Sequence, residues 1–394
     1  MPFTETSVMD ERLCFVSACL RAEEPMSVIC ARYGISRKTG YKWLSRYQAD
    51  GVAGLVERSR APQTSARRFE GLQADMILAL KEHHPTWGPR KLLARLEQDH
   101  PGEVWPAVST AGDFLSRHGL VCPRTVRRHS PASPGPCVEA LSANDSWSAD
   151  LKGWFRTGDG IRCEPLTISD NYSRSLFVCH AVPRLTTEDI RPLFIAAFRE
   201  NGLPKALRTD NGSPFAHRQG LGGLSHFSVW LIKLGIWPDR ITPGRPTQNG
   251  RHERMHRTLA EDTASPPAAT LALQQERFDR WRQIYNTERP HEGIGNKCPA
   301  ELYSPSPRPY PETILPWDYP QDHHVIKVKY KGYIEWNGER IYLSEAFNGE
   351  YVSLAKMDDG NHVIRFRGFD LGYIDEGATK VRCSALARSG QSGT

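Results

Sequence analysis

One stretch of the chain sets a carboxylate among cations, a combination that could act on a polyanion. It reads RPTQNGRHERMHRTL over residues 245–259, and Glu253 is its acidic residue. A solvated surface helix and a metal-dependent active site would both produce this pattern, so the choice depends on carboxylates elsewhere in the chain. The basic and imidazole side chains around Glu253 are Arg251, His252, Arg254, His256 and Arg257.

Two aspartates in strand-like segments could complete such a site. Asp150 lies within SWSADLKGWF, where small or polar residues alternate with apolar ones, and Asp210 follows the short strand pattern in PKALRTDNG. A carboxylate inside a strand lowers stability unless it is paired or bound. The strand ends of open α/β sheets are also where ligand sites form.

Each of the three carboxylates also has an ordinary structural interpretation. Asp150 could form a salt bridge, Asp210 an Asx turn with the following Asn-Gly, and Glu253 an exposed ion pair. Their occurrence together in this strand order favours a shared site. Carboxylate oxygens are suitable ligands for Mg²⁺ or Mn²⁺. Two such ions can activate a nucleophile and stabilise the leaving oxygen in phosphoryl transfer.

The elements that would position these residues alternate between residues 145 and 302, in the order β-β-β-α-β-α-β-α. This pattern predicts an α/β catalytic core with a sheet of mixed strand directions. Thr186, with Asp189 three residues on, predicts a capped helix start. The last helix would begin near Asn249. Its periodicity would place on one face Asn249, Glu253, His256 and Arg257.

The N-terminal segment, residues 9–60, predicts an all-α DNA-binding domain. In MSVICARYGISRKTGYKWLSRY, Gly34 would end a short helix and Ser36 would cap the next one. The second helix is basic, as expected of a helix-turn-helix motif that reads the major groove. A plain helical hairpin with a solvated basic face is the alternative. The candidate DNA-contacting residues are Arg37, Lys38, Lys42 and Arg46.

The remaining segments differ in composition. Residues 70–128 predict a second helical domain, either another helix-turn-helix or a connecting bundle. Residues 129–144 and 303–321 are rich in proline and predict two linkers. Residues 322–378 alternate with period two between turn residues and predict a small β-barrel. Residues 379–394 predict a disordered tail.

Composition limits the class of protein. The chain has 394 residues, a formal charge of +6 and 39% hydrophobic residues, which permits a nucleic-acid partner and several ordinary cores. Nine cysteines without a C-x-x-C pair indicate neither a disulfide framework nor a zinc ribbon. No signal peptide and no membrane-length apolar run are present. We therefore expect a soluble, cytoplasmic protein.

Three segments together resemble a known family. WSADLKG, RTDNGSPF and PTQNGRHERMHRTL resemble the acidic motifs of the DDE integrase-core transposases of bacterial insertion sequences, relatives of retroviral integrases, and IYNTERPHEGIGNKCPAELY resembles the segment after their catalytic glutamate. The resemblance implies an RNase H-like core in which Asp150, Asp210 and Glu253 bind the metal ions and catalyse the reaction. One departure is the 42 residues between Asp210 and Glu253, more than is familiar in the family. We expect the extra residues in AHRQGLGGLSHF.

The resemblance also implies a function and partners. The protein would bind the terminal inverted repeats of its element, cleave to free a 3′-hydroxyl, and join that end to target DNA. It would do so as a homo-oligomer associated with the bacterial nucleoid. Asn249, His256 and Arg257 would contact DNA phosphates, and His252 would be a helper or a packing residue rather than a metal ligand. The alternatives are a nuclease without joining activity and a non-catalytic DNA-binding regulator.

Overall fold

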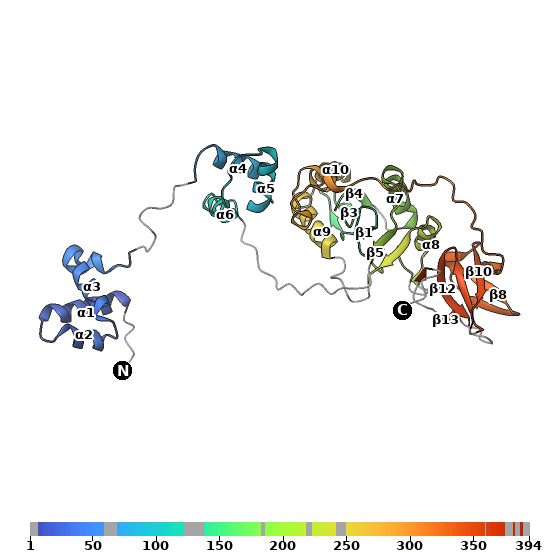
Figure 1. Ribbon diagram of the computed structural model, residues 1–394. Coiled ribbons are helices and arrows are strands. Elements are labelled where there is room, and N and C mark those ends of the chain that lie inside the picture. The colour runs from blue at the N-terminus through green and yellow to red at the C-terminus, as the bar shows by residue number, and fades with distance from the viewer. Residues whose placement is uncertain are drawn as a thin grey trace. The chain divides into compact units, whose positions relative to one another are not determined.

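The chain forms two compact units, Met1–Phe69 and Glu70–Thr394 (Figure 1). The computed structural model describes residues 7–58, 69–121, 138–182, 186–217, 223–241, 250–358 and 360–374, with the backbone of residues 381–382 and 387–388. No helix in these ranges is both long and apolar enough to cross a membrane.

The first unit is the predicted three-helix motif. Ser36 caps the third helix, because its hydroxyl accepts a hydrogen bond from the Thr39 amide at 3.2 Å. Gly34 adopts a left-handed φ of 64° in the preceding turn, a conformation that glycine adopts without strain. Phe15, Ile29 and Trp43 join the helices in one buried cluster. The elements are α1 (Val8–Arg21), α2 (Met26–Arg32), α3 (Arg37–Asp50) and the 3-10 helix η1 (Gly51–Leu55).

The second unit begins with three more helices, as residues 70–128 predicted, although residues 122–128 lie outside the described ranges. Lys81 of the first of these helices holds the connection that follows it, because its ammonium group donates to the carbonyls of Pro85 at 2.6 Å and Trp87 at 2.9 Å. The elements are α4 (Leu72–His83), α5 (Pro89–Asp99) and α6 (Val108–Arg117).

A mixed sheet forms the centre of the second unit, as the sequence predicted. Its strand order is β2-β3-β1-β5-β6, with β4 paired to β3. β1 runs antiparallel to β3 and parallel to β5, and β5 runs parallel to β6. The strands are β1 (Ser146–Leu151), β2 (Phe155–Arg156), β3 (Arg162–Asp170), β4 (Leu176–Val182), β5 (Ala206–Thr209) and β6 (Trp237–Arg240).

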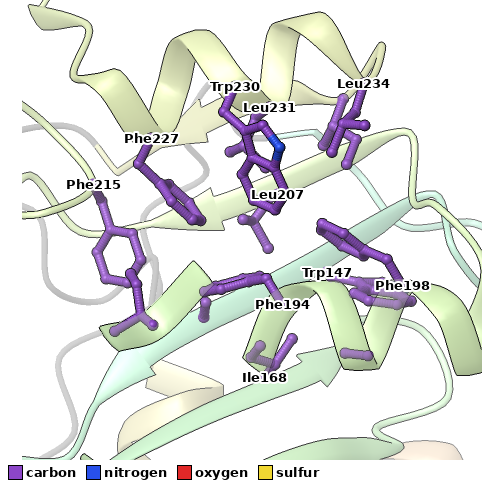
Figure 2. Packing of buried hydrophobic residues seen from close by; sticks show 14 of the residues in the cluster. Trp147, Ile168, Phe194, Phe198, Leu207, Phe215, Phe227, Trp230, Leu231 and Leu234 are labelled. Carbon is purple, nitrogen blue, oxygen red and sulfur yellow. The ribbon is translucent and has the colours of Figure 1, made fainter. Parts of the chain in front are cut away.

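Two separate hydrophobic clusters hold helices against this sheet. Figure 2 shows the first cluster, in which Phe198 of α7 packs against both Trp147 of β1 and Trp230 of α8. The second cluster joins side chains of α9 and α10 to β3 and β4, and Phe278 is at its centre. The helices are α7 (Thr187–Asn201), α8 (His226–Lys233), α9 (Gly250–Thr263) and α10 (Leu271–Thr287).

The C-terminal strands confirm the predicted β content but not a closed barrel. The main sheet has the order β13-β12-β11-β10-β7, with β14 on β12, and β8-β9 form a separate pair. In the described ranges no ladder joins β7 back to the far edge. The apolar side chains of these strands share one buried cluster with Val229 and Ile232 of α8. The elements are β7 (His324–Lys327), β8 (Tyr333–Trp336), β9 (Glu339–Tyr342), η5 (Glu345–Phe347), β10 (Tyr351–Lys356), β11 (His362–Phe366), β12 (Phe369–Ile374), β13 (Val381–Arg382) and β14 (Ala387–Arg388).

The predicted linkers and tail have different outcomes. Residues 303–321 contain no helix or strand and are tied to the core, since the Ser306 amide donates to the Asn201 carbonyl at 2.8 Å and Arg308 donates to the Pro204 carbonyl at 2.9 Å. They follow η4 (Glu292–Ile294) and α11 (Pro299–Leu302). Most of the 129–144 linker lies outside the described ranges. In the predicted disordered tail, β13 and β14 extend the sheet by pairing with β12, and the other tail residues lie outside.

Candidate active site

Asp150 and Asp210 lie at the same end of two neighbouring parallel strands. The β1–β5 ladder ends with Ser148 opposite Arg208, and each aspartate follows its own strand residue by two positions. Both side chains are half-buried. The structure therefore brings these two predicted residues to one edge of the sheet, where α/β folds form their ligand sites.

Local backbone contacts orient both aspartates. Asp150 accepts a hydrogen bond from the Leu151 amide at 2.8 Å. Asp210 accepts one from the Gly212 amide at 3.1 Å, which is the Asx turn considered as its structural alternative. A turn of this kind uses one carboxylate oxygen, so the second oxygen of Asp210 stays available for a ligand.

Glu253 lies in the first turn of α9, and its side chain is exposed. Arg254 and Arg257 are exposed with it, whereas His256 is only 8% exposed. The expectation that His256 shares the face of Glu253 and Arg257 is therefore wrong. His256 belongs to the buried stripe of α9, which also contains His252, Met255 and Leu259. Asn249 lies outside the described ranges.

The two imidazoles of α9 reach the strand that pairs with β1. The Thr167 hydroxyl lies 2.8 Å from His252 Nε2 and 2.7 Å from His256 Nε2, and His256 Nδ1 is 3.9 Å from Asp150 Oδ2. Burial is the largest cause that lowers the pKa of His252 to about 4. Burial, then the neighbouring His252, lowers the pKa of His256 to about 2. Both rings are therefore neutral at physiological pH.

The three carboxylates do not form a closed metal cluster. Among the described residues, no three His, Cys, Asp or Glu side chains are grouped closely enough to hold an ion. The chemistry of the donors still suits a hard cation, because Asp150, Asp210 and Glu253 supply only oxygen. Contact between α9 and Asp150 is instead made by His256, a residue that we expected to face DNA.

Arginines surround the start of α9. Arg251 and Arg174 both donate to the Asn171 carbonyl, at 3.3 and 2.6 Å. Burial, followed by repulsion from Arg251, lowers the pKa of Arg174 to about 10, so it remains cationic. Arg174 has a left-handed φ of 70°. The sequence analysis missed Arg174, because it lies after β3, far from the acidic motifs.

The two ends of the loop that follows Asp210 lie side by side and are joined by backbone contacts. Ala216 forms an antiparallel bridge with Leu224, and the His217 amide donates to the Gly223 carbonyl at 2.9 Å. Arg240 of β6 donates to the same carbonyl at 2.9 Å. The residues between, 218–222, lie outside the described ranges and fall within the segment where we expected the additional length.

Three of the four predicted DNA-contacting side chains of α3 are exposed, namely Arg37, Lys38 and Lys42. Arg46 is partly buried, and its guanidinium lies 5.2 Å from the centre of the Trp43 ring. The Lys42 ammonium is 4.0 Å from the same ring. The exposed side of α3 is thus cationic, while the Arg46 side chain packs partly against Trp43 of the same helix.

Comparison with family models identifies domains over much of the chain. Two models described as integrase core domains match residues 140–246 and 234–299. A helix-turn-helix domain matches residues 11–63, and a homeodomain-like domain matches residues 39–115. The integrase-core matches together include all three candidate carboxylates.

Individual relatives agree with these matches. The chain is 32% identical over 280 residues to the insertion element IS476 39.2 kDa protein of Xanthomonas euvesicatoria, covering 69% of this chain and 76% of the relative. It is 28% identical over 240 residues to the insertion element IS407 31.7 kDa protein of Burkholderia multivorans, covering 58% of this chain and 79% of the relative.

Solved structures that align with the chain include two of viral origin. The integrase catalytic core domain of HTLV-2, solved in complex with magnesium, aligns with a TM-score of 0.32 and 15% identity over 42% of this chain and 100% of that one. A chain from the simian T-cell lymphotropic virus intasome, solved with a PP2A regulatory subunit, aligns with a TM-score of 0.37 and 16% identity, over 80% and 98%.

Proposed function

We propose that this chain, which belongs to the integrase-core family of insertion-element proteins, is a DNA transposase. It would cleave the ends of its element to free a 3′-hydroxyl and join that hydroxyl to target DNA. The observation that supports this most directly is the position of Asp150 and Asp210, two residues beyond the same register pair of adjacent parallel strands.

The carboxylates would hold the metal ions of the reaction. Asp150, Asp210 and Glu253 offer an all-oxygen donor set that fits Mg²⁺ or Mn²⁺. When bound, two such ions would lower the pKa of the attacking water or hydroxyl and stabilise the leaving oxygen. Glu253 is exposed in the first turn of α9, so its carboxylate is accessible to an ion.

The cations near α9 would hold the phosphates of DNA. Arg254 and Arg257 are exposed beside Glu253, and Arg174 and Arg251 add positive charge near the helix start. Phosphate contacts position a duplex without reading its sequence. Because His256 is buried, we assign phosphate contact to Arg257 and not to His256.

Recognition of the element ends would belong to α3. Its exposed Arg37, Lys38 and Lys42 could contact bases and phosphates in the major groove. The terminal inverted repeats of the element are the expected target, and target DNA would be held near the carboxylates. Joining two ends requires them to be held together, so we expect a homo-oligomer.

The test uses the full chain and duplexes carrying the ends of the element. Asp150→Asn, Asp210→Asn and Glu253→Gln should each abolish cleavage and joining, while affinity for the ends stays within about twofold of wild type, because only charge is removed. Glu261→Gln is the matched control, since Glu261 is also exposed on α9 and should leave activity intact.

Joined products distinguish the candidate functions. Wild-type protein that cleaves ends in Mg²⁺ or Mn²⁺ but never joins them to target DNA would be a nuclease. Binding without any cleavage would indicate a DNA-binding regulator. Normal turnover by one of the three variants would remove that residue from the proposed catalytic set.

A further inference from the structure

Thr167 of β3 connects the strand that carries Asp150 to the helix that carries Glu253. It lies directly opposite Asp150 in the β1–β3 ladder and is fully buried. Its hydroxyl lies 3.1 Å from the Asp150 carbonyl oxygen, besides its contacts to His252 and His256 of α9. One side chain therefore joins three chain segments.

The hydrogen-bonding capacity of this hydroxyl is fully used. A hydroxyl has one proton to donate and two lone pairs to accept with, and three partners match that capacity. The Asp150 carbonyl can only accept, so the Thr167 proton goes to it. Each imidazole can then donate to a lone pair of the hydroxyl through Nε2–H.

This arrangement fixes the rotation of α9 about its own axis. His252 and His256 are one helical turn apart, and both meet the same oxygen atom, so a rotation that improves one contact would break the other. Their rings also meet edge to face, with centroids 5.1 Å apart. Glu253 is the neighbour of His252 in the chain, and its direction follows from that rotation.

Thr167, His252 and His256 together form a hydrogen-bonded cluster, here called the node, and this node also lies next to the carboxylate of Asp150. His256 Nδ1 is 3.9 Å from Asp150 Oδ2, while Thr167 holds the backbone of Asp150. Contacts of this kind, one step away from a metal-binding carboxylate, commonly change metal affinity or activity by about 10- to 100-fold when they are removed.

We propose that Thr167, His252 and His256 are positioning residues that hold Glu253 in register with Asp150. This inference rests on the proposed function, because it assigns the node a role in the same site. The node is buried, and the contribution that we propose for it is geometric. None of its members needs to touch DNA or a reacting atom.

Thr167→Val tests the proposal, because valine has nearly the same shape but no hydroxyl. We expect cleavage to slow at least about tenfold and Mn²⁺ binding, measured by electron paramagnetic resonance, to weaken by a similar factor. Affinity for end DNA should not change. Thr167→Ser restores the hydroxyl and should return both the rate and Mn²⁺ binding to near wild type.

Thr263→Val is the matched control. Thr263 is also a buried threonine, lies on α9 itself, and bonds only its own helix through its hydroxyl, to the Leu259 carbonyl at 2.6 Å. This variant should lose a comparable amount of thermal stability without loss of cleavage or Mn²⁺ binding. Equal losses of both in Thr263→Val and Thr167→Val would reduce the node to ordinary packing.

Further outcomes separate this inference from the proposed function. If wild type cleaves and Thr167→Val matches it in rate and Mn²⁺ binding, the node has no positioning role. If Thr167→Val does not fold, His256→Gln and His256→Leu serve instead, because the glutamine amide can still donate to Thr167 and leucine cannot. Mn²⁺ binding at the wild-type level in His256→Leu would overturn the inference. Wild-type protein that neither cleaves nor binds Mn²⁺ would overturn both proposals.

Discussion

Replacing Ile232 by alanine should loosen the C-terminal sheet before the rest of the second unit. α8 has two buried faces. Phe227, Trp230 and Leu231 belong to the cluster that includes β1 and α7, while Val229 and Ile232 belong to the cluster of the C-terminal strands. Ile232 is 1% exposed, so its side chain is buried within that second cluster.

The expected loss follows from the atoms removed. Ile→Ala deletes three carbons, worth about 0.8 kcal/mol each on burial, and the cavity left behind adds to this. Measured substitutions of this kind cost about 2–5 kcal/mol, and we expect about 3 kcal/mol here. A loss of about 3 kcal/mol accelerates exchange through local opening by roughly 100-fold, since about 1.4 kcal/mol corresponds to a factor of ten.

Native-state hydrogen exchange of the full chain measures this effect. Amides of β10, β11 and β12 should exchange about 100-fold faster in Ile232→Ala, with little change in β1 and β5. Leu231→Ala is the control, because it removes an equally buried side chain from the other face of α8. The reasoning is refuted if the two variants give the same pattern of exchange across both sheets.

Two further predictions concern DNA. Arg257→Ala should weaken DNA binding, because one phosphate contact is lost. The slope of log binding constant against log salt concentration should become shallower by about one unit. An unchanged slope across a salt series would place Arg257 outside the DNA interface. Arg37→Ala in the full chain should lower the affinity for element ends more than the affinity for unrelated duplex. Glu23→Ala in the same unit is the control and should change neither affinity. Competition binding with the two duplexes measures the difference.

The fold could be predicted where local patterns decide it. The helix-turn-helix, with Ser36 as the cap, follows from turn and cap chemistry within a few residues. Likewise, alternating patterns predicted the strands of the mixed sheet. A closed barrel could not be distinguished from an open sheet, because closure depends on what covers the apolar face. Here two side chains of α8, from a distant part of the chain, belong to the same buried cluster as these strands.

Residue types suggested which side chains could form the candidate site, but not how those side chains are oriented. Acidic residues in strand and helix patterns pointed to Asp150, Asp210 and Glu253. The side-chain direction of His256 could not be read from spacing, because residues 253, 256 and 257 span a wide arc of a helix and the core decides which edge is buried. The proposed role of Thr167 could not be predicted either, because it depends on the pairing of Thr167 with Asp150 in neighbouring strands.

The two ends of the loop after Asp210 are held together, so the loop can change in length without changing the geometry of the candidate site. Its ends are tied by the Ala216–Leu224 bridge and by the hydrogen bond from His217 to Gly223. Added residues between them would cost mainly loop entropy, about 0.6 kcal/mol for each doubling of length, and would leave β5 and α8 where they are. Added residues here would therefore lengthen the Asp210–Glu253 interval without rearranging the sheet. The same loop offers a position where a reporter peptide could be inserted beside Asp210.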